Sequence, residues 1–179
     1  MSYGILLLRV VLGLTMAGHG AQKLFGWWGG PGLRGTRGFV SSLRFRGGLA
    51  PALALGGAEL GGGLLLALGL FTPFAAFAIA VVMLVAIATT HWRNGFWNGN
   101  GGYEFNLLIL ASAAALAATG GARFSLDRLL GLADNLAGLW WGVGALGAGA
   151  LTALALLTVG RRPEAPAVAE PRQPVQHAA

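Results

Sequence analysis

The 179-residue chain contains no cysteine, and only 10% of its residues are charged. The lack of cysteine excludes disulfide bonds, thiolate metal sites and a thiol relay within this chain. A soluble domain usually has about 25% charged residues, and a soluble chain this short could not hide so much apolar surface in one core. Hydrophobic residues make up 55% of the sequence. This composition favours an integral membrane protein, because a bilayer solvates apolar side chains directly.

Several apolar blocks are long enough, or nearly long enough, to cross a membrane. They comprise residues 5–25, 49–70, 74–90, 105–119 and 139–159. No basic segment precedes the first block, so we expect a retained helix and not a signal peptide. The second and third blocks are joined so closely that they must form an antiparallel hairpin. The sequence therefore predicts a bundle of four or five transmembrane helices.

The connections between these blocks differ in character. Residues 23–48 form a long basic loop, in which residues 33–45 could fold as an amphipathic helix on the membrane surface. Residues 91–104 are rich in glycine, asparagine and aromatic residues, which indicates a structured loop at the headgroup level. Residues 161–179 contain four prolines and three arginines and are typical of a disordered tail. The pairs Gly57/Gly61 and Gly138/Gly142 have helix-packing spacing, although such pairs are common by chance among 31 glycines.

The formal charge of +6 is explained better by membrane topology than by nucleic-acid binding, because the basic residues lie in the segments between the apolar blocks. With five spans, one face of the membrane carries nine of them. These are Lys23, Arg34, Arg37, Arg44, Arg46, Arg93, Arg161, Arg162 and Arg172. The opposite face carries Arg123 and Arg128. The positive-inside rule predicts that the N-terminus is outside and that the tail is cytoplasmic.

Ionisable residues inside a membrane need a partner or a purpose. Arg9, His19 and Lys23 share the first block, and Glu59 lies near the middle of the second. If the two helices are flush at their ends, the level of Glu59 falls between Arg9 and His19. A structural ion pair between Arg9 and Glu59 is one interpretation. The other is that Glu59 carries protons or binds a ligand, and a pair could serve both roles.

Counting spans brings more polar residues to one membrane face. The first block ends with His19 and Lys23, the third ends near His91, and the fourth begins with Glu104 and Asn106. One interpretation is that these are polar side chains at helix ends that reach the membrane surface within a belt of aromatic residues. The other is a ligand-binding or proton-handling site, for which a quinone is suitable because its oxygens need donors and its ring can stack on aromatics. The candidate residues are His19, Lys23, Glu59, His91, Glu104 and Asn106.

Metal binding is the weaker alternative for this face. His19, His91 and Glu104 could supply two imidazoles and a carboxylate. Their spacing is no metal signature, however, and the charge of nearby Lys23 would disfavour a cation. We therefore expect no metal site.

Three segments form a wider pattern: LRVVLGLTMAGHGAQKLFGWWGGPG, GGAELGGGLLLALGLFTP and HWRNGFWNGNGGYEFNLLIL. In these segments, which cover about residues 5–120, the chain resembles the DoxX family of small bacterial membrane proteins. The resemblance implies a four-helix transmembrane bundle, and the family's recurrent polar positions match Arg9, His19, Lys23, Glu59, His91 and Glu104. The chain departs from the family in its additional C-terminal transmembrane helix. We expect a membrane domain over 1–122, a connecting loop over 123–138, the extra helix over 139–160 and the tail over 161–179.

The resemblance also implies a redox setting in the bacterial plasma membrane. The family's name comes from a subunit associated with an archaeal thiosulfate:quinone oxidoreductase, and other members look like partners of a superoxide dismutase and a sulfurtransferase. The first hypothesis is therefore a redox-associated subunit that binds a quinone-like, lipid-soluble ligand. Without cysteine or a haem or flavin motif, the chain alone would be a poor electron carrier. The alternatives are a non-enzymatic membrane anchor or assembly factor and a small-solute or lipid transporter. The sequence is also compatible with a homo-oligomer.

Overall fold

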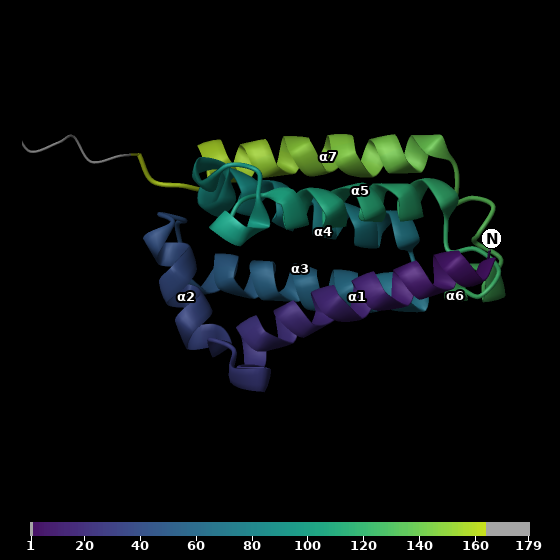
Figure 1. Ribbon diagram of the computed structural model, residues 1–179, viewed down its shortest axis with the longest axis horizontal. Helices are drawn as coiled ribbons and strands as arrows, with labels where there is room; N and C mark the ends of the chain where they lie inside the picture. Colours follow the sequence, from purple (N-terminus) through teal and green to yellow (C-terminus); the bar gives the residue numbers. More distant parts are fainter. Residues whose placement is uncertain (1, 164–179) are drawn as a thin grey trace, which may run out of the picture.

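The computed structural model describes residues 2–163, and the regular secondary structure of this range is helical (Figure 1). The long helices are α1 (Ser2–Phe25), α3 (Leu49–Leu68), α4 (Thr72–Ala86), α5 (Glu104–Thr119) and α7 (Leu139–Thr158). The short elements between them are η1 (Trp27–Gly29), α2 (Gly32–Ser42), the π-helical turn η2 (Ile87–His91), η3 (Trp92–Asn94), η4 (Asn98–Asn100) and α6 (Leu126–Leu129).

The lengths of these helices fit a bilayer. Within the described residues, four stretches are long and apolar enough to cross a membrane: Ser2–Phe25, Leu49–Leu68, Thr72–Asn94 and Leu139–Thr158. The third stretch continues α4 through η2 and η3. Helix α5 is apolar but shorter, with 16 residues and a length of about 24 Å. The expected all-α membrane protein, with a four-helix bundle and an additional C-terminal transmembrane helix, is confirmed.

The long helices form two layers, with α1 and α3 in one and α4, α5 and α7 in the other (Figure 1). A core of apolar side chains fills the space between them, with Met16, Leu66, Ile79 and Ala113 fully buried. Helix α7 packs against both α4 and α5. The C-terminal helix is therefore a member of the bundle and not a loosely attached addition.

Glycines set the separation of α1 and α3. A Cβ atom on Gly20 would lie 2.3 Å from the backbone nitrogen of Leu60, and one on Gly63 would lie 2.4 Å from that of Ala17. Such close approach is typical of small residues at helix contacts in membranes. The pair Gly57/Gly61, whose spacing suggested packing, has no atom within 4 Å of its virtual Cβ positions. The packing glycines therefore lie on a different face of α3 from the one that this pair occupies.

The amphipathic helix expected over 33–45 forms as α2 and crosses the end of the bundle where α1 ends (Figure 1). The Thr36 hydroxyl donates a hydrogen bond to the Lys23 carbonyl (2.9 Å) and holds α2 against α1. Beyond α2, the chain pairs with the end of α7, where the amide of Arg46 donates to the Gly160 carbonyl at 2.9 Å. This backbone hydrogen bond joins the end of α7 to the segment that connects α2 with α3. The rest of the expected tail, from residue 164, lies outside the described residues.

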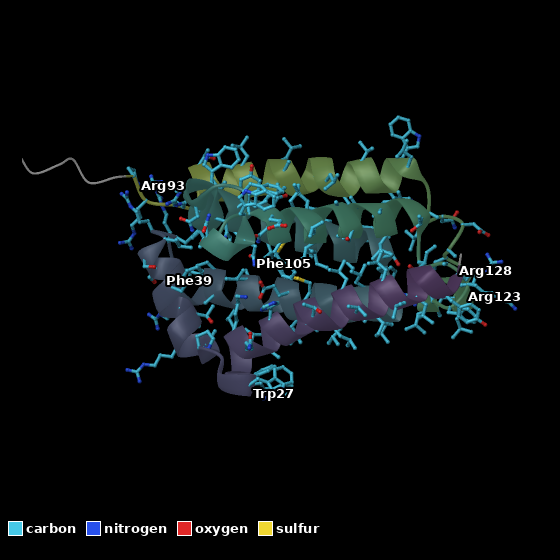
Figure 2. All side chains as sticks on the ribbon, in the orientation of Figure 1. Trp27, Phe39, Arg93, Phe105, Arg123 and Arg128 are labelled. Carbon is cyan, nitrogen blue, oxygen red and sulfur yellow. The ribbon has the colours of Figure 1, made fainter. Side chains whose placement is uncertain are left out.

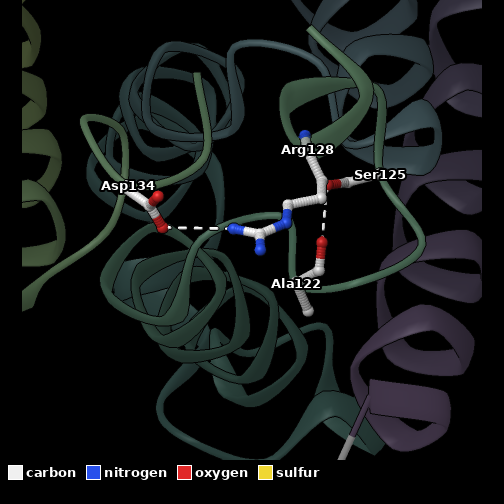
Figure 3. Close-up of polar contacts among 4 residues, drawn as sticks. All are labelled: Ala122, Ser125, Arg128 and Asp134. Carbon is white, nitrogen blue, oxygen red and sulfur yellow. Dashed lines mark hydrogen bonds and ion pairs between the residues drawn. The ribbon is translucent and has the colours of Figure 1, made fainter. Parts of the chain in front are cut away.

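The connecting segment expected over 123–138 contains the short helix α6 at the opposite end of the bundle. Ser125 caps this helix, accepting a hydrogen bond from the Arg128 amide (3.1 Å) and donating one to the Ala122 carbonyl (2.7 Å). Figure 3 shows the Arg128 side chain reaching across to Asp134, with 3.3 Å between Nη1 and Oδ1. Both side chains are exposed, so this ion pair contributes little to stability.

Candidate functional site

A cavity of about 560 Å³ lies between the two helical layers near the α2 end of the bundle. Its walls come from α1, α2, α3, α4, α5 and α7, together with η2 and η4. Figure 2 shows Phe39 on α2 and Phe105 between the layers, and both line the cavity. The lining is mostly apolar and includes Met16, Phe39, Val40, Leu43, Phe45, Leu55, Phe77, Val81, Val82, Phe105, Ile109 and Leu156.

Lys23 of α1 and Glu59 of α3 form an ion pair in this cavity, with 2.6 Å between Nζ and Oε2. The side chain of Glu59 is only 5% exposed and that of Lys23 is 23% exposed. The Lys23 ammonium is close enough to donate to Glu59 Oε2, and no other described residue donates a hydrogen bond to this oxygen. The pair therefore balances two charges but leaves acceptor capacity on the carboxylate.

The expected ion pair between Arg9 and Glu59 is wrong. Gly13 of α1 lies against Ala67, and Gly20 lies against Leu60, so α1 and α3 are antiparallel and Arg9 is near the level of Phe71. Arg9 is thus about twelve residues, or about 18 Å along the helix, from the level of Glu59. The expectation assumed that the two helices end flush, whereas their glycine contacts shift the register by about six residues, or nearly two turns.

Arg9 is instead an anchor at the opposite end of the bundle. Its guanidinium donates hydrogen bonds to the carbonyl groups of Ala67, Gly121 and Phe124, the first at 3.2 Å. These bonds connect α1 to the end of α3 and to the segment before α6. Since the donors bind backbone oxygens and the residue is buried, Arg9 serves the fold.

Sequence reasoning missed Asp127, a fully buried carboxylate of α6. It accepts hydrogen bonds from the amides of Phe71 (2.7 Å) and Thr72 (3.1 Å) and from the Thr72 hydroxyl (2.8 Å). These amides begin α4, and Phe71 at the N-cap offers no side-chain acceptor of its own. That missing acceptor is the signal in the sequence that a distant carboxylate was needed.

His91 reaches the cavity from the π-helical turn η2. π-Helical turns are rare in proteins, but those that occur often lie at functional sites. His91 Nδ1 lies 2.7 Å from the Gly101 carbonyl, so Nδ1 donates its proton there. In the neutral ring, Nε2 is then an acceptor. The turn also places Thr89 and Thr90 in the lining, two residues that the sequence analysis did not select.

Asn106 and His19 complete the polar lining. Asn106 is buried on α5, and its amide nitrogen lies 3.5 Å from the sulfur of Met83. A thioether is a weak acceptor, so this amide keeps hydrogen-bonding capacity. His19 lies one helical turn before Lys23 on the same face of α1. Five of the six predicted residues thus surround one cavity: His19, Lys23, Glu59, His91 and Asn106.

Glu104 is the predicted residue that does not line the cavity. Its Oε2 accepts a hydrogen bond from the Asn98 amide (3.0 Å), and its own amide donates to the Phe96 carbonyl (2.9 Å). Glu104 therefore holds the loop over residues 91–104, called the aromatic loop below, against the start of α5. Among the described residues, no three His, Cys, Asp or Glu side chains are grouped to hold a metal, so the alternative set of His19, His91 and Glu104 is not assembled.

Comparisons with known proteins agree with this architecture. A DoxX family model matches residues 4–92, and a model described as the TQO small subunit DoxD matches residues 49–142. A Bacillus subtilis (strain 168) protein named "Putative oxidoreductase CatD" is 33% identical over 124 residues, which is 69% of this chain and 84% of that protein. No solved structure gives a significant match. The chain therefore belongs to the DoxX family of bacterial multi-pass membrane proteins.

Proposed function

We propose that the cavity binds a quinone-like, lipid-soluble ligand and that the chain is a membrane subunit of a redox system. The observation that carries this proposal is the convergence of five polar side chains on one mostly apolar cavity between membrane-spanning helices. Its volume of about 560 Å³ lies within the usual range for small-molecule sites. The names of the matching DoxD model and the Bacillus relative support a redox setting.

The residues present fit a quinone-like headgroup. Among the described residues, the partner of Asn106 Nδ2 is the Met83 sulfur, a weak acceptor, so this amide can donate to a ligand oxygen. Lys23 and the two histidines bring further groups that hold or exchange a proton. Phe77 and Phe105 offer ring faces for packing. A bound quinone would supply the two-electron chemistry, while these residues orient its ring and exclude water from it.

Titration of the purified protein with a short-chain quinone tests this function. We expect saturable binding that Asn106→Leu and His91→Ala each weaken about threefold to tenfold, the range for one lost hydrogen bond. Thr119→Val is the matched control, because Thr119 lies at the other end of α5 and its hydroxyl bonds to the Ala115 carbonyl of its own helix. Absence of saturable binding, or equal affinity in all four proteins, would refute the proposal.

A further inference from the structure

The charges in the cavity lining cancel one another. Lys23 and Glu59 are the formally charged residues among the described lining residues, and their charges are 2.6 Å apart. An anionic ligand would have to compete with Glu59 for Lys23, and a cationic ligand would have to compete with Lys23 for Glu59. Breaking a buried pair leaves an uncompensated charge, which is strongly unfavourable. The cavity is therefore suited to an uncharged ligand.

The carboxylate of Glu59 offers hydrogen-bond acceptor positions in the cavity. The Lys23 ammonium lies 2.6 Å from the buried Oε2 of Glu59 and supplies a donor to it. No other described residue donates a hydrogen bond to this oxygen. A carboxylate has about four lone-pair positions, so the ion pair leaves acceptor positions free on Glu59, which lines the cavity. A donor group of a ligand can occupy one of them.

We propose that Glu59 accepts a hydrogen bond from a hydroxyl group of the ligand, so that the cavity prefers the uncharged dihydroxy form of a quinone-like ring to the oxidised diketone. This inference rests on the proposed function and specifies which redox state is bound. A hydroxyl donates to a carboxylate in a short, charge-assisted bond. A carbonyl oxygen of the diketone only accepts, so it would face the carboxylate lone pairs without a proton between them.

Anaerobic equilibrium dialysis of the full chain in nanodiscs tests the preference. The probes are a short-chain naphthoquinone and the same compound kept reduced with dithionite. We expect the wild type to bind the reduced form about tenfold more tightly, the effect of one hydrogen bond to a charged group. Glu59→Gln should bring the ratio close to one, because an amide can both donate and accept. The matched control Asp134→Asn, at an exposed site at the opposite end, should keep the wild-type ratio.

A second measurement uses the wild type alone, because Glu59→Gln leaves Lys23 unpaired and could unfold the bundle. The same reduced ring carrying a carboxylate or a trimethylammonium group should bind at least about tenfold more weakly than the uncharged ring. If the wild type binds the oxidised form as tightly as the reduced form, the inference is wrong and the proposed function stands. If it binds neither form, both are wrong.

Discussion

The buried polar residues of this protein divide into two kinds. Arg9 and Asp127 are buried at one end of the bundle, and their hydrogen bonds are made to backbone groups and to Thr72. Glu59 and Asn106 are buried near the other end, and each keeps capacity for a hydrogen bond. A polar group whose bonds are all made within the protein stabilises the fold. One with capacity left over beside a cavity indicates a ligand site.

Asp127 allows this distinction to be tested at a single residue. Replacing it with alanine removes the acceptor of two amides and one hydroxyl at the start of α4. We expect Asp127→Ala to lower the free energy of unfolding by about 3 kcal/mol, because each buried donor left without a partner is unfavourable. Denaturation with sodium dodecyl sulfate in mixed micelles measures the change.

The control for Asp127→Ala is Asp134→Ala, at a position seven residues further along the chain whose side chain is 91% exposed. Loss of its surface ion pair with Arg128 should change the unfolding free energy by less than about 1 kcal/mol. Equal effects of the two substitutions would contradict the role of Asp127 as the anchor of α4.

The residue types of the site could be predicted, but their pairing could not. Ionisable residues in apolar blocks stand out because a membrane makes them unfavourable, and this drew attention to Glu59 and Lys23. Their pairing depends on the register of α1 against α3, which Gly20 and Gly63 set through contacts of their backbones. Hydropathy carries no information on that register. Glu104 was misplaced for a related reason, since its partner Asn98 depends on the folded path of the aromatic loop.

At the scale of elements, the spans agree closely with the apolar blocks because hydropathy reports membrane crossing directly. The block expected over 139–159 is α7 (Leu139–Thr158). Its place in the bundle was less predictable, since the family resemblance covers mainly the preceding helices. Helix α7 contributes Thr152 and Leu156 to the cavity lining and is joined to the α2–α3 connection through Arg161, whose Nε donates to the Leu43 carbonyl at 2.9 Å.

Two glycines of α7 test whether this helix is part of the site. A Cβ on Gly149 would lie 3.0 Å from the Cβ of Ala80 on α4, whereas Gly147 has open space around it. We expect Gly149→Leu to force α7 away from α4, with a loss of about 2 kcal/mol in the free energy of unfolding. Quinone binding should weaken with it, because Thr152 and Leu156 move out of the lining.

The matched control on the same helix is Gly147→Leu, which should leave both stability and quinone affinity near the wild-type values. Denaturation in mixed micelles and quinone titration measure the two properties. Unchanged binding in a folded Gly149→Leu variant would show that the cavity does not depend on the position of α7.

At the scale of the whole molecule, the two ends of the bundle differ in charge. The α2 end carries Arg34, Arg37, Arg44, Arg46, Arg93, Arg161 and Arg162 among the described residues. The opposite end carries Arg9, Arg123 and Arg128, together with the acidic residues Asp127 and Asp134. Figure 2 shows Arg93 at the first end and Arg123 and Arg128 at the second. Because arginine and lysine accumulate on the cytoplasmic side of membrane proteins, we expect the α2 end, and with it the cavity, to face the cytoplasm.

The absence of cysteine makes this orientation directly measurable, since any introduced cysteine is the single thiol of the chain. Ser42→Cys places a thiol on an exposed residue at the α2 end, and Asp134→Cys places one on an exposed residue at the opposite end. In intact spheroplasts, a membrane-impermeant maleimide should label the second variant and not the first, and both should react once the membrane is permeabilised. The reverse pattern would put the seven arginines of the α2 end on the outer face, against the positive-inside rule. It would also mean that the cavity lies nearer the outer face of the membrane.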